Sequence, residues 1–266
     1  VVIANPAGIS CAGCGFINAD RATLTTGAPI MNEGHLDGYA VSRGEISIQG
    51  AGLDGRGTAY TDIIARSVRI NAGIWANDLK VTTGSNYVDA DHTQAAPFAS
   101  LGAKPEFAID VAHLGGMYAG KIRLVGTEHG VGVRNAGTLA AESGDLMITL
   151  DGRLVNSGLL QGKQDIQVTT EGGVRNSGTI SAQREALLNT AADLDNSAGR
   201  LNAARLDLSA QSLKNRDGDL EQTGTQALAI VAASLTNREA GRIGVAEAPN
   251  GSESGAEGTP TTPDAG

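Results

Sequence analysis

The sequence predicts an all-β fold, a β-solenoid (β-helix) in which the chain winds through stacked coils. Three observations predict it: a repeat of about 20 residues, apolar pairs at i and i+2 within each repeat, and a long stretch without proline or aromatic residues. No proline lies between Pro105 and Pro249, and no aromatic residue follows Tyr118. A proline-free stretch is typical of sheet in which every backbone N–H is used in a ladder.

The repeat is marked by asparagines that recur at steps of 19 to 22 residues: Asn135, Asn156, Asn176, Asn196, Asn215 and Asn237. Each unit also carries an apolar i, i+2 pair, such as Ile166 and Val168, whose side chains face one side of a strand. Such a unit cannot bury its apolar side alone, so neighbouring units must stack. Recurrent asparagine at a turn can adopt left-handed φ and bond to the next coil, which predicts a structural asparagine ladder.

A leucine-rich-repeat horseshoe is the alternative architecture, but its L-x-x-L-x-L-x-x-N signature and a helical i, i+3, i+4 pattern are absent. The theme extends backwards to "INAGIWANDLKV" at Asn71, and "RATLTTG", "GEISIQG" and "KIRLVG" predict further strands. Residues 85–118 break the rhythm and contain Pro and Phe. We therefore expect an extra-helical excursion there.

Charge and hydropathy exclude several partners. Lys and Arg number 20 against 29 Asp and Glu, a net charge of −9, which argues against nucleic acid or an anionic membrane as the partner. No apolar run approaches the roughly 18 residues of a membrane helix, so we expect no membrane insertion.

Cys11 and Cys14, the only cysteines, form a C-x-x-C. A zinc site needs four ligands, and neither a second C-x-x-C nor paired histidines accompany this one. A redox dithiol needs a helix N-terminus, whereas the flanks "NPAGIS" and "GFINAD" predict turn and strand. A short disulfide formed in an oxidising compartment is favoured over both.

Other motifs point only weakly to chemistry. Gly50-x-Gly52-x-x-Gly55 matches a dinucleotide fingerprint, but no clear helix opens there, and glycine-rich solenoid corners explain it. A carboxylate pair like those of polysaccharide-cleaving β-helices could come from five residues: Asp62, Asp78, Asp89, Asp91 and Asp110. No motif supports such a pair, so we expect no catalytic, cofactor-binding or metal site.

The stretches "VVIANPAGISCAGCGFINADRATLTTGAP", "VSRGEISIQGAGLDG", "YTDIIARSVRINAGIWANDLKVTTGSNYVD" and "GGMYAGKIRLVGTEHGVGVRNAGTL" resemble a known family. They are similar to the secretion domain of two-partner secretion exoproteins of the filamentous haemagglutinin, haemolysin and contact-dependent inhibition type. The resemblance covers roughly residues 1–140, and the later units resemble the haemagglutinin repeats of the same proteins.

This resemblance implies a right-handed parallel β-helix that is exported through the periplasm and recognised by a cognate outer-membrane β-barrel transporter. The family's usual motif is Asn-Pro-Asn-Gly-Ile, here Asn5-Pro6-Ala7-Gly8-Ile9. Asn5, Pro6, Gly8 and Ile9 are therefore candidates for transporter recognition or for a structural turn. Ala7 departs from the motif and lacks a side chain that could cap the turn. A first motif and N-terminal cap, which the family places upstream, are not present, so we interpret the chain as N-terminally truncated.

We expect residues 1–134 to be the C-terminal part of a secretion domain, residues 135–247 to be haemagglutinin-type repeats, and residues 248–266 to be a Gly/Ser/Thr/Pro-rich tail. The predicted function is a non-catalytic secretion-targeting and adhesin stalk module, secreted or displayed on the bacterial surface. A receptor on a host or neighbouring cell would bind through parts not present here. The alternatives are a polysaccharide-acting β-helix enzyme, or a truncated remnant without independent function.

Overall fold

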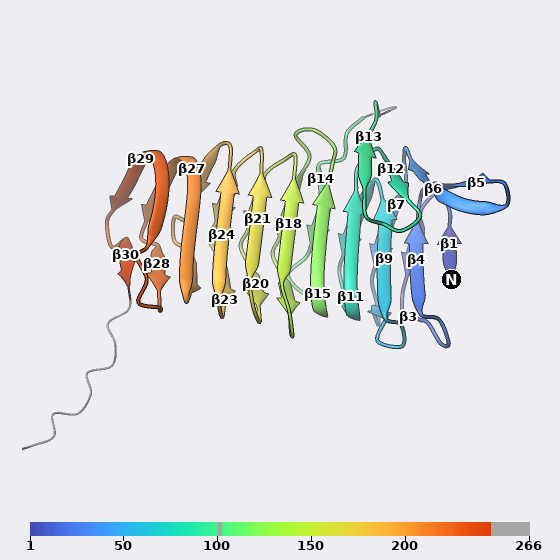
Figure 1. Cartoon of the computed structure of the whole chain (residues 1–266), viewed down its shortest axis with the longest axis horizontal. Helices are drawn as coiled ribbons and strands as arrows, with labels where there is room; N and C mark the ends of the chain where they lie inside the picture. The colour runs from blue at the N-terminus through green and yellow to red at the C-terminus, as the bar shows by residue number, and fades with distance from the viewer. Residues whose placement is uncertain (101–102, 246–266) are drawn as a thin grey trace, which may run out of the picture.

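The structure is a computed structural model that describes residues 1–100 and 103–245. Within these ranges the chain contains strands and no helix, and consecutive coils stack side by side into an elongated parallel β-solenoid (Figure 1). This confirms the predicted all-β fold. No helix long and apolar enough to span a membrane occurs in the described part of the chain. The predicted tail, residues 248–266, lies outside it.

Each coil contributes a strand to three parallel faces, which we call A, B and C. Face A contains β1 (Val2–Ala4), β4 (Arg21–Thr25), β9 (Tyr60–Ala65), the second halves of β11 (Gly73–Thr83) and β15 (Gly116–Gly126), β18 (Leu146–Leu150), β21 (Ile166–Thr170), β24 (Glu185–Thr190) and the first halves of β27 (Arg205–Arg216) and β29 (Ala229–Arg238). The strands of face A lie in front in Figure 1.

Faces B and C complete the coil. Face B contains β2 (Ile9–Cys11), β7 (Glu45–Ile48), β10 (Ser67–Ile70), β14 (Phe107–Val111), β16 (Gly132–Asn135), β19 (Leu154–Asn156), β22 (Val174–Asn176), β25 (Asp193–Asp195) and the second halves of β27 and β29. Face C contains β3 (Cys14–Gly15), β8 (Leu53–Asp54), the first halves of β11 and β15, β17 (Thr138–Ala141), β20 (Leu159–Gly162), β23 (Thr179–Ala182), β26 (Arg200–Ala203), β28 (Asp219–Gln222) and β30 (Arg242–Val245).

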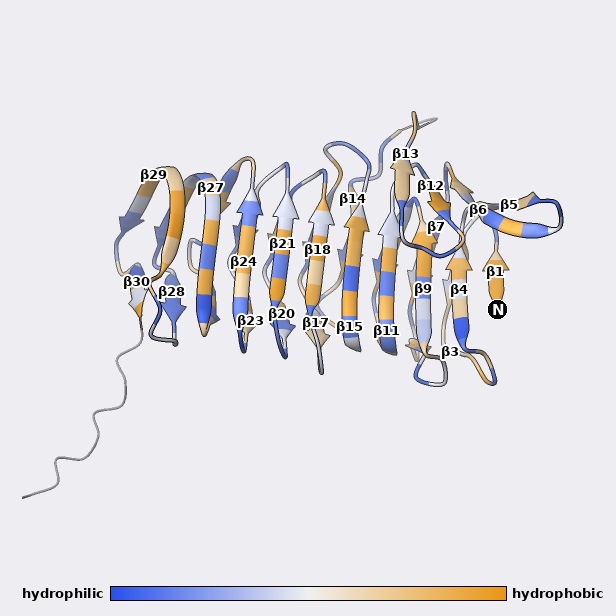
Figure 2. Ribbon diagram, viewed as in Figure 1, coloured by the Kyte–Doolittle hydropathy of each residue, from blue (hydrophilic) through white to orange (hydrophobic). Residues whose placement is uncertain are grey.

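The core consists of columns of aliphatic side chains that run along the solenoid. On face A one column is formed, coil by coil, by Leu24, Ile63, Val81, Leu124, Ile148, Val168, Leu188 and Leu208. Inward and outward residues alternate along each strand, which produces the alternating apolar and polar bands of Figure 2. Because every interior residue packs on its equivalent one coil away, this narrow core is filled without a buried aromatic ring.

Two segments leave the solenoid at the corner between faces A and B. β5 (Ala28–Asn32), β6 (His35–Val41), β12 (Asn86–Asp89) and β13 (Ala95–Pro97) form a separate antiparallel sheet, the excursion sheet, in the order β13-β12-β6-β5. It packs on the outward side of face A through a small apolar cluster of Tyr39, Val41, Ile64 and Val88.

The predicted excursion is therefore present, but it is shorter than residues 85–118. Phe107–Val111 and the residues from Gly116 onward are regular solenoid strands. The first excursion, residues 28–41, was not predicted. Its signal is a two-residue hairpin turn at Glu33-Gly34, where both residues have positive φ (49° and 86°), as a type I′ turn requires.

A buried ion pair spans the coil that the second excursion opens. Arg66 lies at the A/B corner of the preceding coil and Glu128 at that of the following coil. The Arg66 guanidinium donates Nη2 to Oε1 (2.9 Å) and Nε to Oε2 (3.2 Å) of Glu128. Burial acts to raise the pKa of Glu128, but the hydrogen bonds and charge of Arg66 outweigh it and lower that pKa. The stability from this lowered pKa is therefore present near neutral pH and is lost as Glu128 becomes protonated in acid.

Alanine substitution should affect stability very differently at Gly158, which lies at the corner between faces B and C, and at Gly244, which lies within β30. A Cβ on Gly158 would lie 2.0 Å from the carbonyl oxygen of Gly137 in the preceding coil, whereas nothing lies within 4 Å of a Cβ on Gly244. Gly158→Ala should lower the free energy of unfolding by about 1–3 kcal/mol, and Gly244→Ala should change it by less than about 0.5 kcal/mol. Urea unfolding followed by circular dichroism measures both, and equal effects would contradict the corner geometry.

Candidate functional site

The motif Asn5–Ile9 forms a tight turn at the A/B corner of the first coil. Its backbone closes with a hydrogen bond from Gly8 N to Asn5 O (3.0 Å), and Asn5 N donates to Thr25 O (2.9 Å) in the next coil. The Asn5 side chain caps the turn, because its Oδ1 accepts from the N–H of Ala7 (3.1 Å). The turn is thus capped by Asn5 without a polar side chain at position 7.

Gly8 and Ile9 join this turn to the next coil. Gly8 has φ +127°, and a Cβ there would lie 2.9 Å from the carbonyl oxygen of Glu45, so this position requires glycine. Ile9 begins β2, is in register with Ile46, and is half-buried against the core. Asn5 itself is exposed and Pro6 is half-buried. The structure therefore brings the four motif residues together in one turn whose outer side is open to solvent.

Cys11 and Cys14 lie at the B/C corner of the same coil and are joined by a disulfide, with their Cα atoms 5.5 Å apart. Cys11 is in register with Ile48 on face B, and Cys14 with Leu53 on face C. Cys11 is fully buried. The pair thus occupies two core columns and links two faces across their shared corner. In this setting the C-x-x-C takes a structural position.

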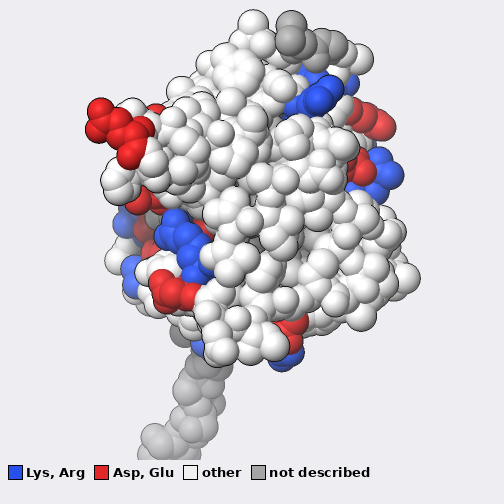
Figure 3. Space-filling model, turned by 90° about the vertical axis from the view of Figure 1, so that its right-hand side faces the viewer, with Lys and Arg blue, Asp and Glu red and all other residues white. Residues whose placement is uncertain are grey.

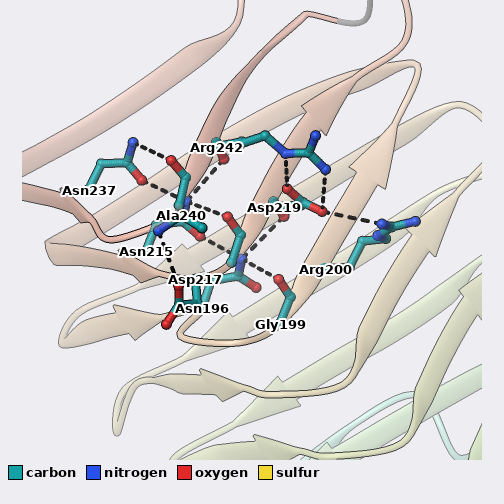
Figure 4. A network of polar contacts seen from close by, with 11 residues as sticks. Asn196, Gly199, Arg200, Asn215, Asp217, Asp219, Asn237, Ala240 and Arg242 are labelled. Atoms are coloured by element: carbon teal, nitrogen blue, oxygen red, sulfur yellow. Dashed lines mark hydrogen bonds and ion pairs between the residues drawn. The ribbon is translucent and has the colours of Figure 1, made fainter.

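The six repeat asparagines lie in one buried column at the B/C corner. Each Nδ2 donates to the Oδ1 of the next asparagine, at 2.8 Å (135 to 156), 2.8 Å (156 to 176), 2.7 Å (176 to 196), 2.9 Å (196 to 215) and 2.9 Å (215 to 237). Five of the six Nδ2 groups also donate to a backbone carbonyl of the next coil, such as that of Leu159 for Asn135. Figure 4 shows the last three members of the column.

A charged column runs beside the ladder on face C. Asp219 accepts from Arg242 Nε (2.7 Å) on one side and from Arg200 Nη2 (3.2 Å) on the other, so three coils share one chain of charges (Figure 4). The hydrogen bond from Arg242 is the main cause of the lowered pKa of Asp219. These exposed pairs add little stability individually, but they favour the observed register of the coils.

The ladder begins at Asn135 with an unpaired atom. The same column in the preceding coils is apolar and holds Val111, Ile70, Ile48 and Cys11. Asn135 Oδ1 therefore faces Val111 and is buried without a hydrogen-bond partner. Asn71 is exposed and lies one position beyond this column, so its expected place in the asparagine series is wrong. The change from apolar to amide packing occurs at Asn135.

Of the residues considered for chemistry, Asp62 and Asp78 line a common pocket, and the others lie elsewhere. Asp62 and Asp78 lie on face A, and Asp89 lies on β12 with Asp91 in the loop that follows it. Asp110 lies on face B, where it pairs with Arg134 at 2.8 Å. Gly50 and Gly52, from the glycine motif, have positive φ at a solenoid corner. No group of three or more His, Cys, Asp or Glu side chains that could hold a metal occurs among residues 1–100 and 103–245.

A parallel solenoid with a capped first-coil turn, a side sheet and an internal asparagine ladder defines a class of protein, the repetitive β-helix. Comparisons specify it further. A family model of the TPS secretion domain, the secretion domain of two-partner secretion, matches residues 1–156, and a model of the haemagglutinin repeat matches residues 141–198 and 160–246. The chain belongs to the TPS secretion domain family.

Relatives and a solved structure agree with this assignment. Toxin CdiA of Yersinia pestis is 63% identical over 167 residues, which are 62% of this chain and 5% of the relative. The tRNA nuclease CdiA-2 of Burkholderia pseudomallei is 51% identical over 159 residues, 59% of this chain and 5% of the relative. A crystal structure of a filamentous hemagglutinin secretion domain has a TM-score of 0.53 and 24% identity, covering 88% of this chain and 65% of that one, which supports the fold. The chain thus matches only about a twentieth of these two relatives.

Because Asn135 Oδ1 is unpaired, the ladder asparagines should differ in how much each contributes to the free energy of unfolding. Asn135 and Asn176 are both fully buried and both donate to the next coil, but only Asn176 Oδ1 accepts a hydrogen bond, from Asn156. Asn176→Val should therefore lower the free energy of unfolding by about 1–3 kcal/mol more than Asn135→Val, because it also removes the Oδ1 acceptor of one N–H of the Asn156 amide. Urea unfolding of the two variants measures the difference. An equal or larger loss for Asn135→Val would show that the ladder does not start at this residue.

Proposed function

We propose that this chain is a non-catalytic secretion-targeting module with the first part of a stalk, from a large two-partner secretion exoprotein. A cognate outer-membrane β-barrel transporter recognises its N-terminal coils after passage through the periplasm, and the chain folds as a β-helix at the cell surface. The observation that carries this proposal is the TPS secretion domain match over residues 1–156. The continuous solenoid, which joins that region to the repeats without a break in strand pairing, supports it.

The turn Asn5–Ile9 is the proposed element of transporter recognition. It lies at the N-terminal end of the solenoid, its Asn5 side chain is exposed, and its shape is fixed by bonds to the next coil. The surface of this end is largely uncharged, with Lys, Arg, Asp and Glu gathered at its rim (Figure 3). Recognition there would depend on turn shape, backbone groups and apolar contacts rather than on charge.

The later coils are the proposed stalk, and an adhesive role would belong to the surface that this stalk displays. The relatives named for toxin or nuclease activity are about twenty times longer than the matched region. We assign no such activity to these residues. A polysaccharide-acting β-helix enzyme is not favoured. Asp62 and Asp78 share a pocket on face A, but Asp62 is buried against His92 at 3.0 Å, and the other three candidate carboxylates lie elsewhere.

Secretion assays on Asn5 test the recognition proposal. Asn5→Ala removes the acceptor for Ala7 N and should cost the turn about 1 kcal/mol, roughly a five-fold loss in its population, and so reduce the secreted fraction. Asn5→Asp keeps an acceptor at that position and should be secreted close to the parent level. The chain, carrying an export signal, is co-expressed with its transporter, and the secreted and periplasmic pools are quantified. Secretion of Asn5→Ala at the parent level would show that this turn is not part of the recognition element.

The same assay tests whether folding of the coils drives release. Leu154 is fully buried, whereas its neighbour Val155 faces outward between Arg134 and Arg175 of the adjacent coils. Leu154→Asp places a charge in the core and should prevent stacking of that coil, so secretion should fall. Val155→Asp gains two cationic neighbours and should leave secretion unchanged. Equal secretion of both variants would contradict a role for coil folding.

A further inference from the structure

A small polar pocket lies where the excursion sheet meets face A. It has a volume of about 190 Å³, and its walls include Lys80 and Thr82 of β11, Arg123 of β15, and His92, Thr93 and Gln94 of the loop between β12 and β13. The pocket is outside the N-terminal turn and the asparagine ladder, and neither the family match nor the proposed function assigns it a role.

Two like charges face each other in this pocket. Lys80 and Arg123 are directly opposite on adjacent parallel strands, and both point outward, since their neighbours Leu79, Val81 and Leu124 fill the core. Like charges directly opposite on a sheet are destabilising unless an anion compensates them. The lining of this pocket contains no carboxylate, although Lys80 and Arg123 also line an adjoining pocket that contains Asp62, Asp78 and Asp145. Asp62 of β9 lies opposite Lys80 on the other side of its strand. It leaves Arg123 as the cation of this pair for which no ion pair is recorded among the described residues.

The loop that forms the other wall is held in place by its own hydrogen bonds. Asp89 Oδ1 accepts from the backbone N–H groups of Thr93 (2.8 Å) and Gln94 (2.9 Å). Lys80 Nζ donates to the carbonyl of His92, and this bond leaves further ammonium N–H donors free. The pocket is therefore formed before any ligand arrives.

The loop also places a buried histidine behind the pocket. The His92 side chain is 1% exposed, and its Nδ1 lies 3.0 Å from Asp62 Oδ1. Neither ring nitrogen makes a well-aligned hydrogen bond. His92 φ is +56°, a left-handed conformation that non-glycine residues adopt rarely, so the loop turns sharply at this position. The His92 ring fixes the loop on face A, while the carbonyl of the same residue orients Lys80.

We propose that this pocket binds a phosphate group, either as the free ion or as a phosphate monoester carried on a sugar. The Arg123 guanidinium offers a fork of N–H donors and Lys80 a compact positive charge, the pair of cations that phosphate sites use. The side chains of Thr93 and Gln94 supply neutral donors at the rim. A phosphate group has enough oxygens to accept from both cations and from the rim donors at once, whereas a carboxylate has only two.

Titration of the whole chain with inorganic phosphate, glucose 1-phosphate and acetate, followed by amide chemical shifts in NMR at low ionic strength, tests the site. We expect phosphate to shift the amides of residues 92–95 and 123 with saturation, and acetate to bind much more weakly. Tighter binding of glucose 1-phosphate than of inorganic phosphate would indicate a sugar-borne ligand. Equal binding of these two would indicate the free ion.

Two matched variants distinguish binding of phosphate in this pocket from nonspecific attraction of phosphate to nearby positive charge. Arg123→Gln should weaken phosphate binding by at least about ten-fold, since a hydrogen bond to a charged group contributes about 1.5–3 kcal/mol. Lys121→Gln removes an equal charge two residues away on the same strand, outside the pocket lining, and should leave the affinity within about two-fold. No saturable shift with phosphate, or equal weakening by both variants, would overturn the proposal.

Discussion

The structure depends on one constraint: a single coil cannot bury its own apolar side chains. Each coil places only one or two aliphatic residues per face into the interior, and these become buried only when the neighbouring coils supply the same residues above and below. Parallel, in-register stacking follows directly, because a shift by one residue would turn the inward set outward. The interior therefore consists of columns such as Ile63, Val81 and Leu124 rather than of a three-dimensional cluster.

The B/C corner satisfies this constraint in two chemically different ways. In the first coils the corner column is apolar, and it starts at Cys11, whose disulfide to Cys14 links two faces. From Asn135 onward it is an amide ladder, in which the side chain satisfies backbone carbonyls that a tight corner would otherwise leave unpaired. The change from one packing to the other leaves Asn135 Oδ1 buried without a hydrogen-bond partner. The column thus changes chemistry at Asn135, within the residues that the TPS secretion domain model matches, while the strands continue across this point.

The sequence was most informative where structure is local and periodic. The asparagine spacing and the i, i+2 pairs predicted the solenoid and the ladder column, because period and register are the same property in a stacked coil. It was least informative where residues distant in the chain meet. The hairpin around Glu33-Gly34 and residues 86–97 form one sheet only because both leave the same corner. Pro105 and Phe107 suggested a longer excursion, yet Phe107 begins β14 and places its ring against Arg134, 4.5 Å from the guanidinium carbon.

The pocket at Lys80 and Arg123 shows why a site of this kind escapes sequence analysis. The two cations are 43 positions apart in the chain, and they are opposite each other only because one coil and one excursion separate them. Its other wall comes from a loop whose conformation depends on Asp89 and on contact of His92 with Asp62.

The direction of the ladder bears on how the chain would fold during export. Asn135 to Asn215 each donate an amide N–H toward the next coil, and Asn156 to Asn237 each accept from the previous one, so a finished coil presents free donors at its C-terminal side. A coil that arrives later finds both an apolar column and an unpaired amide in the correct register. Stacking in the order of the chain therefore satisfies each group as it arrives, whereas stacking in the reverse order would leave carbonyl and Oδ1 acceptors waiting for donors. A chain that leaves a transporter with its N-terminal coils already folded would gain free energy with each coil, and this gain would oppose backward movement.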